Sequence, residues 1–473
     1  MKMALGVWIV LSLCGVAGAD VFNMGGTRNP DGSWTGLASL ETVLVANPGN
    51  LIRYPLEPEC DQGVVNYVYN IGKYEVTAGQ YCEFLNAVAA TDTYGLYSYR
   101  MHPTYYGSRC HIEQTGISGS YTYTVASDWA NRPVGYVNWG DAARFCNWLH
   151  NDQPSGAQDL TTTEDGAYFL NGAITDEEFF AVNREADWKW ALPDYDEWYK
   201  AAYHKNEGIA GNYFEFPTSS DVEPSNDLVD PDPGNNATFL GEQEGEPDCT
   251  IGDPYYRTEV GAHENSASPY GTFDQGGNVL EWTERMWQNH GVGCLLLGGS
   301  YALSADYMSG ERDWFDGPAG EYSTYGFRVC AAWSPGDFSG DRLVNMADVD
   351  MLWAVRDTDV PLTDGMYDLA ANGHIDLGDA KELIQNIVGT SMADTNLDGI
   401  VDLRDLCNLA DRYGRTGDFG DGDANFDGVI DIFDLGEMAD DYGKTFAGGP
   451  IPEPTSLALL ALGAVAVIRR RCV

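Results

Sequence analysis

Basic side chains and histidines are scarce in this chain, and several common catalytic motifs are missing. Its 473 residues include 26 Lys and Arg against 72 Asp and Glu, which gives a formal net charge of -46. That charge repels the phosphates of nucleic acids and the anionic face of a membrane, and therefore argues against both as partners of the main body. The 7 histidines show no HExxH spacing, and neither Gly-x-Ser-x-Gly nor Gly-x-x-x-x-Gly-Lys occurs. The sequence offers no alternative catalytic set of these kinds.

Long hydrophobic runs are also few, and the first lies at the N-terminus. Lys2 is followed by an apolar run from Met3 to Val16 and then by Ala17-Gly18-Ala19. A basic residue, an apolar core and small residues in that order are typical of a secretory signal peptide. We therefore expect residues 1–19 to be a signal peptide and the mature chain to begin at Asp20.

A second apolar run, Leu457 to Ile468, lies near the C-terminus. Twelve helical residues reach about 18 Å, well short of the roughly 30 Å hydrocarbon core of a bilayer. Pro452-Glu453-Pro454 precedes the run and three arginines follow it. This arrangement in residues 450–473 resembles the PEP-CTERM sorting signals of Gram-negative bacteria, and the alternative is a short anchor. Either interpretation predicts an exported protein at the cell surface, at the outer membrane or outside the cell, which meets a membrane only through this tail.

Eight of the ten cysteines lie between the two terminal segments. An exported chain with so many cysteines is expected to form some disulfides, although spacing alone does not give the connectivity. The eight are Cys60, Cys82, Cys110, Cys146, Cys249, Cys294, Cys330 and Cys407.

Residues 20–333 have the pattern of a large mixed α+β domain. Val64 to Tyr69 has the composition of a strand, and Thr77 and Asn138 are placed as N-caps of two helices. Asp194, with Glu197 three residues later, predicts a capping box at the start of a third helix. Residues 211–261 are rich in Gly, Pro, Asn and Asp, and predict long ordered loops that cover buried aromatic side chains.

Several motifs in this segment occur in the order found in one known family. They are Tyr74–Thr77, Arg132–Val134, Val137–Ala142, Leu192-Pro193, Gly276–Trp282, Gly298–Tyr301 and Tyr325–Arg328. Together they resemble the formylglycine-generating, or sulfatase-modifying factor, family. The resemblance implies an α+β fold related to C-type lectins. It also implies a pocket that receives an extended peptide in active members, which oxidise a substrate cysteine with copper.

Two positions separate this chain from the active members of that family. In those members a cysteine two residues after the Trp of Gly-Gly-Ser-Trp, and another five residues further on, bind Cu(I), whereas Leu303 and Met308 stand here. Soft thiolates select Cu(I), and neither side chain can supply one. Copper is therefore not expected, and a relocated pair of Cys294 and Cys330 is a minor alternative. Ser300 aligns with the family's serine beside the pocket.

The resemblance implies two further features of the domain. Asn278 and Glu281 match the family's structural calcium site, and a solvated or salt-bridged carboxylate is the less favoured alternative for Glu281. The family commonly joins a helix cysteine to a cysteine of the closing strand, which here would be Cys146 and Cys330. The strand cysteine directly follows the arginine in the family, whereas Val329 intervenes here.

Residues 335–447 contain two matches to a twelve-residue calcium loop. Calcium takes six or more oxygens, so acidic or amide side chains alternate, a glycine makes the sharp turn, and a main-chain carbonyl completes the set. The expected ligands are Asp394, Asn396, Asp398, Ile400 and Asp405 in one loop, and Asp423, Asn425, Asp427, Val429 and Asp434 in the other. The carbonyls of Ile400 and Val429 are the main-chain ligands.

Two earlier copies keep the spacing but depart from the pattern at single positions. One has Arg342 in place of the glycine, and the other has Ala370 at its third position. Their expected ligands are Asp337, Ser339, Asp341 and Asp348, and Asp368, Asn372 and Asp379. Each loop leads into one short amphipathic helix, which resembles type I dockerin repeats. The resemblance implies a small all-α, EF-hand-like module that binds a cohesin-like partner, and a calcium-stabilised spacer is an equal alternative.

These observations favour an exported binding or structural protein that does not act as an oxidase. Its main domain would hold a peptide, a glycan or a surface polymer, and calcium would organise its C-terminal repeats. An active formylglycine-generating oxidase that modifies a sulfatase cysteine is the first alternative. A scaffold component assembled through the dockerin-like repeats is the second.

Overall fold

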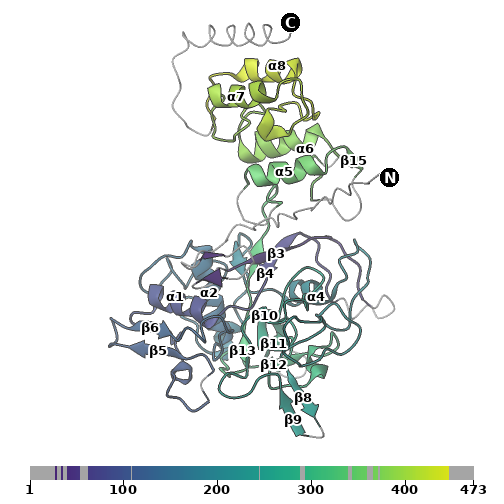
Figure 1. Cartoon of the computed structure of the whole chain (residues 1–473). Coiled ribbons are helices and arrows are strands. Elements are labelled where there is room, and N and C mark those ends of the chain that lie inside the picture. The colour runs from purple at the N-terminus through teal and green to yellow at the C-terminus, as the bar shows by residue number, and fades with distance from the viewer. Residues whose placement is uncertain are drawn as a thin grey trace, which may run out of the picture.

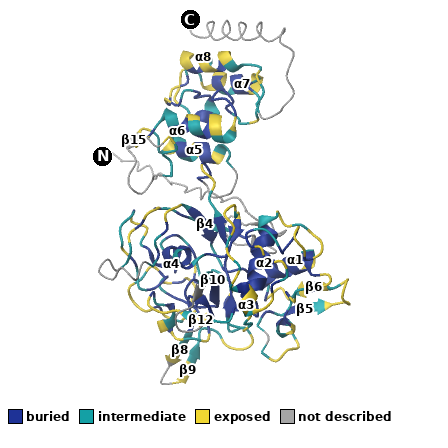
Figure 2. Cartoon of the chain, turned by 180° about the vertical axis from the view of Figure 1, so that it is seen from behind, coloured by how far each residue is buried: buried dark blue, intermediate teal, exposed yellow. Residues whose placement is uncertain are grey.

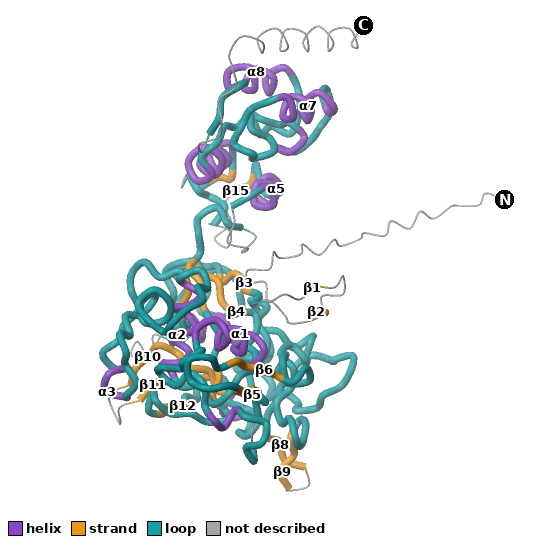
Figure 3. The backbone as a smooth tube through the Cα atoms, turned by 90° about the vertical axis from the view of Figure 1, so that its left-hand side faces the viewer, coloured by secondary structure: helices purple, strands orange, loops and turns teal. Residues whose placement is uncertain are grey.

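The structure is a computed structural model, and it describes residues 27–28, 34–35, 40–53, 62–107, 109–243, 246–287, 293–338, 344–359, 366–370 and 373–446. The expected signal peptide and sorting tail lie outside the described residues, as do Cys60, Ser339, Asp341 and Asn372. The described chain forms a large lower body and a smaller helical body joined by a narrow connection (Figures 1 and 3).

Two four-stranded sheets organise the large body. The first has the order β3 (Thr42–Val45), β4 (Tyr69–Gly72), β14 (Cys330–Ala332) and β7 (Trp190–Ala191), and its neighbours are antiparallel. The second has the order β12 (Trp314–Asp316), β11 (Gly293–Leu297), β10 (Leu280–Trp287) and β13 (Tyr325–Gly326), with β10 and β13 parallel. Strands from distant parts of the sequence meet in both sheets, and β14 lies between β4 and β7 in the first.

The three predicted helix starts are confirmed. Thr77 caps α1 (Ala78–Val88), Asn138 caps α2 (Trp139–His150), and Asp194 caps α4 (Tyr195–Tyr203), each through a capping box. The strand predicted from Val64 to Tyr69 is wrong except at its last residue, because β4 begins only at Tyr69. Residues before it form turns, where Asn50 Oδ1 accepts from the main-chain N–H of Val65 at 3.2 Å.

Shorter elements and long loops complete the large body. They are η1 (Tyr99–Met101), α3 (Asp176–Phe179), η2 (Ala305–Met308) and the two-stranded pairs β1 (Thr27–Arg28) with β2 (Trp34–Thr35), β5 (Ile112–Thr115) with β6 (Thr122–Val125), and β8 (Leu240–Gln243) with β9 (Glu246–Cys249). The last pair is the only regular structure described in residues 211–261. Of the aromatic side chains expected to be buried there, Tyr213, Phe216 and Phe239 are buried, whereas Phe214, Tyr255 and Tyr256 are only partly buried.

An aromatic core fills the space between α1, α2 and the strands, and Figure 2 colours these elements as largely buried. Phe84 and Phe145 meet edge to face with ring centroids 5.3 Å apart, and Phe145 makes a similar contact with Phe327 at 5.4 Å. All three are fully buried, and such pairs add to the stabilisation from burial alone. The mixture of helices and strands confirms the α+β class.

The smaller body consists of repeated loop-and-helix units. Its helices are α5 (Met346–Ala354), α6 (Leu377–Lys381) continuing into the π-helix η3 (Glu382–Val388), α7 (Leu403–Arg412), η4 (Phe419–Asp421) and α8 (Ile432–Asp441). A short ladder joins β15 (Thr358–Asp359) to β16 (His374–Ile375). None of the helices in the described part of the chain has the length and apolar character needed to cross a membrane.

Candidate functional site

A cavity of about 280 Å³ lies at the turn that follows β11, where the sequence places Ser300 and Leu303. Trp314 and Tyr325 line it together with these two residues, and the Trp314 indole N–H donates to the Tyr325 hydroxyl at 3.0 Å. Ser300 itself is fully buried, and its main-chain carbonyl accepts from the N–H of Leu303 at 3.0 Å. The serine therefore takes part in a tight turn at the cavity wall.

Met308 does not line this cavity. Its side chain is fully buried in a small cluster with Phe216, Phe239 and Ala305, and its main-chain carbonyl accepts from the Tyr203 hydroxyl at 3.0 Å. The first of the two copper positions is thus a leucine in a cavity wall, and the second is a methionine in a filled core. The arrangement provides no pair of soft, ionisable ligands at these positions.

The alternative thiols, Cys294 and Cys330, are not brought together. Cys294 lies on β11 and donates to the carbonyl of Thr283 at 2.9 Å, whereas Cys330 lies on β14 of the other sheet and donates to the carbonyl of Asn70 at 3.2 Å. Burial raises the pKa of both thiols well above the usual value, which disfavours a thiolate. Cys294 and Cys330 therefore do not form a pair of copper ligands in this arrangement.

The disulfide expected between Cys146 and Cys330 is not formed, because both are free, buried thiols. Successive residues of a strand face opposite sides of a sheet. Val329 and Ala331 pack in the same core as Cys146, whereas Cys330 packs on the other side with Tyr69 and Ile71. The extra residue between Arg328 and the cysteine therefore turns the thiol away from α2. The other described cysteines are free as well.

Glu281 is held in a buried ion pair. Arg328 donates to its two carboxylate oxygens, from Nε at 2.6 Å and from Nη2 at 2.7 Å, and Trp198 Nε1 donates at 2.6 Å. The three side chains are fully buried, which makes these charge-assisted bonds important for the local structure. Glu281 is therefore the salt-bridged carboxylate predicted as the alternative to a calcium ligand.

Asn278 supplies one unpaired oxygen beside this ion pair. Its Nδ2 donates to Glu75 Oε2 at 3.0 Å, while its buried Oδ1 has no hydrogen-bond partner in the described structure. Calcium requires six or more oxygens, and the carboxylate of Glu281 is already engaged by Arg328 and Trp198. Asn278 and Glu281 in this arrangement therefore do not fit a calcium site.

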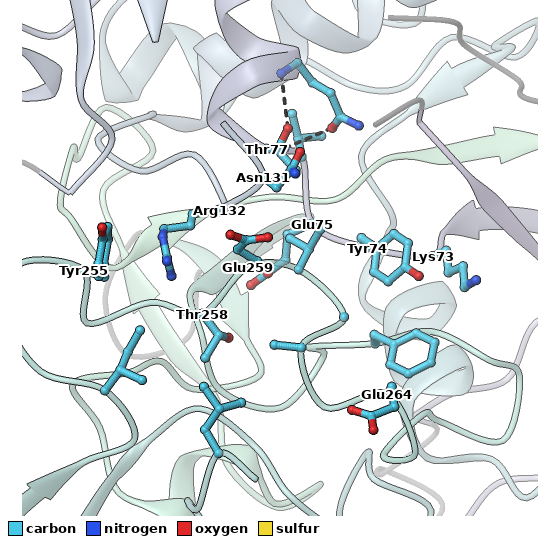
Figure 4. A pocket seen from close by; sticks show the side chains of 18 of the residues that line it. Lys73, Tyr74, Glu75, Thr77, Asn131, Arg132, Tyr255, Thr258, Glu259 and Glu264 are labelled. Carbon is cyan, nitrogen blue, oxygen red and sulfur yellow. Dashed lines mark hydrogen bonds between the residues drawn. The ribbon is translucent and has the colours of Figure 1, made fainter. Parts of the chain in front are cut away.

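A second cavity, of about 940 Å³, was not predicted from the sequence, and Glu75 is one of the residues that line it (Figure 4). Glu75 is 1% exposed, and its Oε1 accepts from the main-chain N–H of Val279 at 3.2 Å. Burial and the nearby carboxylates of Asp274 and Glu281 raise its pKa well above the usual value, against the opposing effect of Arg328. The sequence signal for this buried acid was Glu75 itself, an acidic residue between Tyr74 and Val76 and two positions before the helix cap Thr77.

The two best-matched repeat loops have the same hydrogen-bond framework. Asp394 Oδ2 accepts from the N–H of Gly399 at 2.8 Å, and Asp423 Oδ2 accepts from the N–H of Gly428 at 2.8 Å. Equivalent bonds link the third, fifth, seventh, ninth and twelfth positions of both loops. Leu397 and Phe426, at the fourth positions, both have positive φ. The repeated sequence therefore specifies a repeated backbone.

The earlier copies keep part of this framework. Asp348 and Asp379, at twelfth positions, are fully buried and accept from the ninth-position N–H groups of Asn345 at 2.8 Å and Asp376 at 2.7 Å. Asp337 is also fully buried, and Asp368 accepts from the N–H of Gly373 at 2.9 Å. The four units thus share their helix-capping geometry.

The carboxylates of these loops are not yet gathered around a common point. Burial raises the pKa of Asp394, Asp405, Asp423 and Asp434. Within the described ranges, no three His, Cys, Asp or Glu side chains come together as ligands of one metal ion. The donor chemistry and the loop backbone fit calcium, and binding would require the like-charged side chains to move closer together.

Comparisons with known proteins place most of the chain in one family. The sulfatase-modifying factor enzyme 1-like domain matches residues 39–333, and the PEP-CTERM protein-sorting motif matches residues 450–471. The motif confirms that part of the C-terminal prediction and supports export to the cell surface or extracellular space of Gram-negative bacteria. No curated protein matches the chain.

Three solved structures are similar to parts of the chain. Treponema denticola variable protein 1 has 18% identity and a TM-score of 0.39, and the match covers 63% of this chain and 97% of that one. CarF has 16% identity, a TM-score of 0.37 and coverages of 62% and 99%. PvdO from Pseudomonas aeruginosa has 15% identity, a TM-score of 0.31 and coverages of 65% and 97%. Because the family match extends over more than half of the sequence, the chain belongs to the sulfatase-modifying factor enzyme 1-like domain family.

Proposed function

We propose that this exported protein is a binding protein that does not perform copper-dependent cysteine oxidation. The supporting observation is the pair Leu303 and Met308, which stand where active relatives have copper-binding cysteines. Leu303 lies in a cavity wall and Met308 in a filled core. An alkyl group and a buried thioether cannot form a copper dithiolate or exchange with a substrate thiol. The Ser300 cavity would then contribute to holding a peptide, a glycan or a surface polymer.

The test incubates the purified protein with Cu(I) and a sulfatase-type Cys-x-Pro-x-Arg peptide. We expect no stoichiometric copper binding in competition with a chromophoric chelator and no aldehyde by mass spectrometry. A Leu303→Cys, Met308→Cys double variant is the matched control, because it restores both thiols and is expected to increase copper binding. Copper binding by the wild-type chain together with peptide oxidation would establish the oxidase alternative.

We also propose that residues 335–447 form a calcium-organised module next to the domain of residues 20–333. Two loops that share a repeated set of hydrogen bonds support this proposal. Calcium would neutralise the loop carboxylates, and the side chains and carbonyls named for each loop would hold it. The module would dock a cohesin-like partner, which makes the protein part of a surface scaffold, or act as a spacer between the main domain and the sorting tail.

A calcium titration followed by circular dichroism tests the module, and a subsequent pull-down of surface proteins by the full chain tests docking. Calcium-dependent retention of a cohesin-like protein would support docking. Ordering by calcium without any retained partner would favour the spacer. The absence of any calcium response would rule out both forms of the module.

A further inference from the structure

The cavity floored by Glu75 is separate from the Ser300 cavity and shares none of its lining residues. The chain from Lys73 to Gln80, at the entry to α1, forms one side, and the loop of residues 251–264 forms the other (Figure 4). Its volume of about 940 Å³ is within the usual range for a small-molecule site. The cavity is therefore large enough for a ligand or a long side chain.

The Glu75 carboxylate lies at the buried end of this cavity without a cationic partner of its own. Its hydrogen-bond donors, Asn278 Nδ2 and the Val279 N–H, are both neutral. The guanidinium that interacts electrostatically with Glu75, that of Arg328, is already bound to both oxygens of Glu281. A buried carboxylate is costly unless a positive charge approaches it, so the floor of the cavity favours a cation.

The two cationic side chains among the described lining residues are engaged elsewhere. Lys73 Nζ lies 3.4 Å from Glu41 and 5.2 Å from the ring centre of Tyr74. Arg132 lies 4.0 Å from the ring centre of Tyr255, and its Nε donates to the carbonyl of Asp128 at 3.0 Å. Neither side chain therefore neutralises Glu75, whose carboxylate remains available to a cationic ligand.

The walls suit a slender apolar chain with a polar end. Val76, Ile251 and Val260 supply aliphatic surface, and Leu228, which is 43% exposed, extends it outwards. Asn131 Oδ1 is buried and has no hydrogen-bond partner in the described structure, so it adds an acceptor to the wall. Glu259 and Glu264 are exposed lining residues and increase the negative potential at the entrance.

We propose that this cavity binds an alkylammonium group, such as the end of a lysine side chain, with Glu75 as its counter-ion. The aliphatic walls contact the methylene groups, and Asn131 and Glu259 accept further N–H bonds from the ammonium group. The site goes beyond the proposed function, because it is independent of the copper positions and of the calcium loops. Failure of either of those proposals leaves it intact.

Calorimetric titration of the full chain in 150 mM salt tests the site with two matched pairs of probes. Cadaverine against 1-pentanol tests a free amine, and acetyl-Gly-Lys-Gly-amide against its Nε-acetylated form tests a peptide-borne one. We expect each charged probe to bind at least tenfold more tightly than its neutral counterpart. The preferred charged probe identifies the source of the amine. Equal affinities within both pairs, or no binding of either amine, would overturn the proposal.

Variants then locate the binding. Glu75→Gln keeps the side-chain shape and should weaken amine binding at least tenfold, and its circular dichroism spectrum reports whether it folds. Gly252→Trp is the second variant, because a Cβ at Gly252 meets no atom within 4 Å and the ring would occupy the cavity entrance. It should abolish binding. Glu113→Gln changes an exposed carboxylate on β5 and should have no effect. Unchanged binding by a folded Glu75→Gln or by Gly252→Trp would contradict the site.

Discussion

At the scale of single residues, the position of one cysteine in β14 decides whether a disulfide can join this strand to α2. The sequence correctly showed that Val329 separates Cys330 from Arg328, but strand alternation was needed to turn that spacing into a direction. The same limit applies to Glu281, whose partners Trp198 and Arg328 are 83 and 47 residues away. A local sequence pattern cannot distinguish a metal-binding carboxylate from one that forms a buried ion pair, because the partner of the carboxylate is set by packing between distant parts of the chain.

Substitution Val329→Cys should allow a disulfide to form with Cys146. It places a thiol directly after Arg328 in the core that also contains Cys146, and a disulfide closing so long a loop stabilises a protein by about 2 to 4 kcal/mol. Peptide mapping of protein purified under oxidising conditions should find the Cys146 peptide linked to the new cysteine, and the midpoint of urea unfolding should rise. The wild-type chain is the control, since its own Cys330 faces the other side. A free Cys146 in the variant would refute this orientation.

Lys200 should make stability depend on pH. It is fully buried, its Nζ donates to the carbonyl of Asn47 at 2.8 Å, and burial lowers its pKa to about 7. Between pH 7 and pH 10 the unfolded chain binds this proton more strongly than the folded chain does. The free energy of unfolding of the wild type therefore rises with pH across this range. The advantage of Lys200→Met over wild type should therefore shrink by up to about 4 kcal/mol across that range.

Urea unfolding at unit pH intervals measures the Lys200 effect. Lys189→Met is the control, because the Lys189 side chain is 50% exposed. Its stability relative to wild type should not change with pH. A constant difference between Lys200→Met and wild type would show that Lys200 stays charged in the folded protein.

At the scale of elements, capping boxes and loop repeats were predictable, whereas strand limits were not. Thr77, Asn138 and Asp194 act through residues three positions away, so their signals are local. The chain before Tyr69 has strand-like composition, yet it forms turns because β4 pairs with β3 and β14 only from that residue onwards. The repeat loops also depend on spacing within twelve residues, which explains why their backbone agrees with the pattern.

Contacts between different repeats could not be predicted from the sequence pattern, and one of them comes from α5. Trp353 Nε1 on α5 donates to Asp423 Oδ2 at 3.2 Å, which orients the first acidic residue of the last loop. Trp353→Phe removes this donor at a cost of about 1 kcal/mol and should weaken calcium binding at the last loop roughly fivefold. Calorimetric calcium titrations compare it with Trp333→Phe, since Trp333 Nε1 donates instead to the main-chain carbonyl of Asp337 at 2.8 Å. Identical titrations of Trp353→Phe and wild type would mean that α5 does not influence the loop.

At the scale of the whole molecule, the two bodies have different sources of stability. The large body has an extensive aromatic core, whereas the smaller one has two modest clusters and many buried carboxylates. Residues 335–447 contain 25 acidic and 7 basic side chains, a net charge of -18. Self-repulsion should therefore loosen the small body when divalent cations are absent, while the large body stays folded.

Calorimetric unfolding of the full chain should consequently show two transitions, and removal of calcium should lower only the one that belongs to the helical body. Sodium chloride should partly restore that transition, because it screens repulsion among exposed carboxylates but cannot replace the coordination of buried ones. An Asp405→Ala, Asp434→Ala variant, which removes the twelfth-position carboxylates of the last two loops, should lose most of the calcium response and should retain the main-domain transition. If chelation instead shifted both transitions equally, calcium would have to stabilise the large body too, and the separate origin of their stabilities would be wrong.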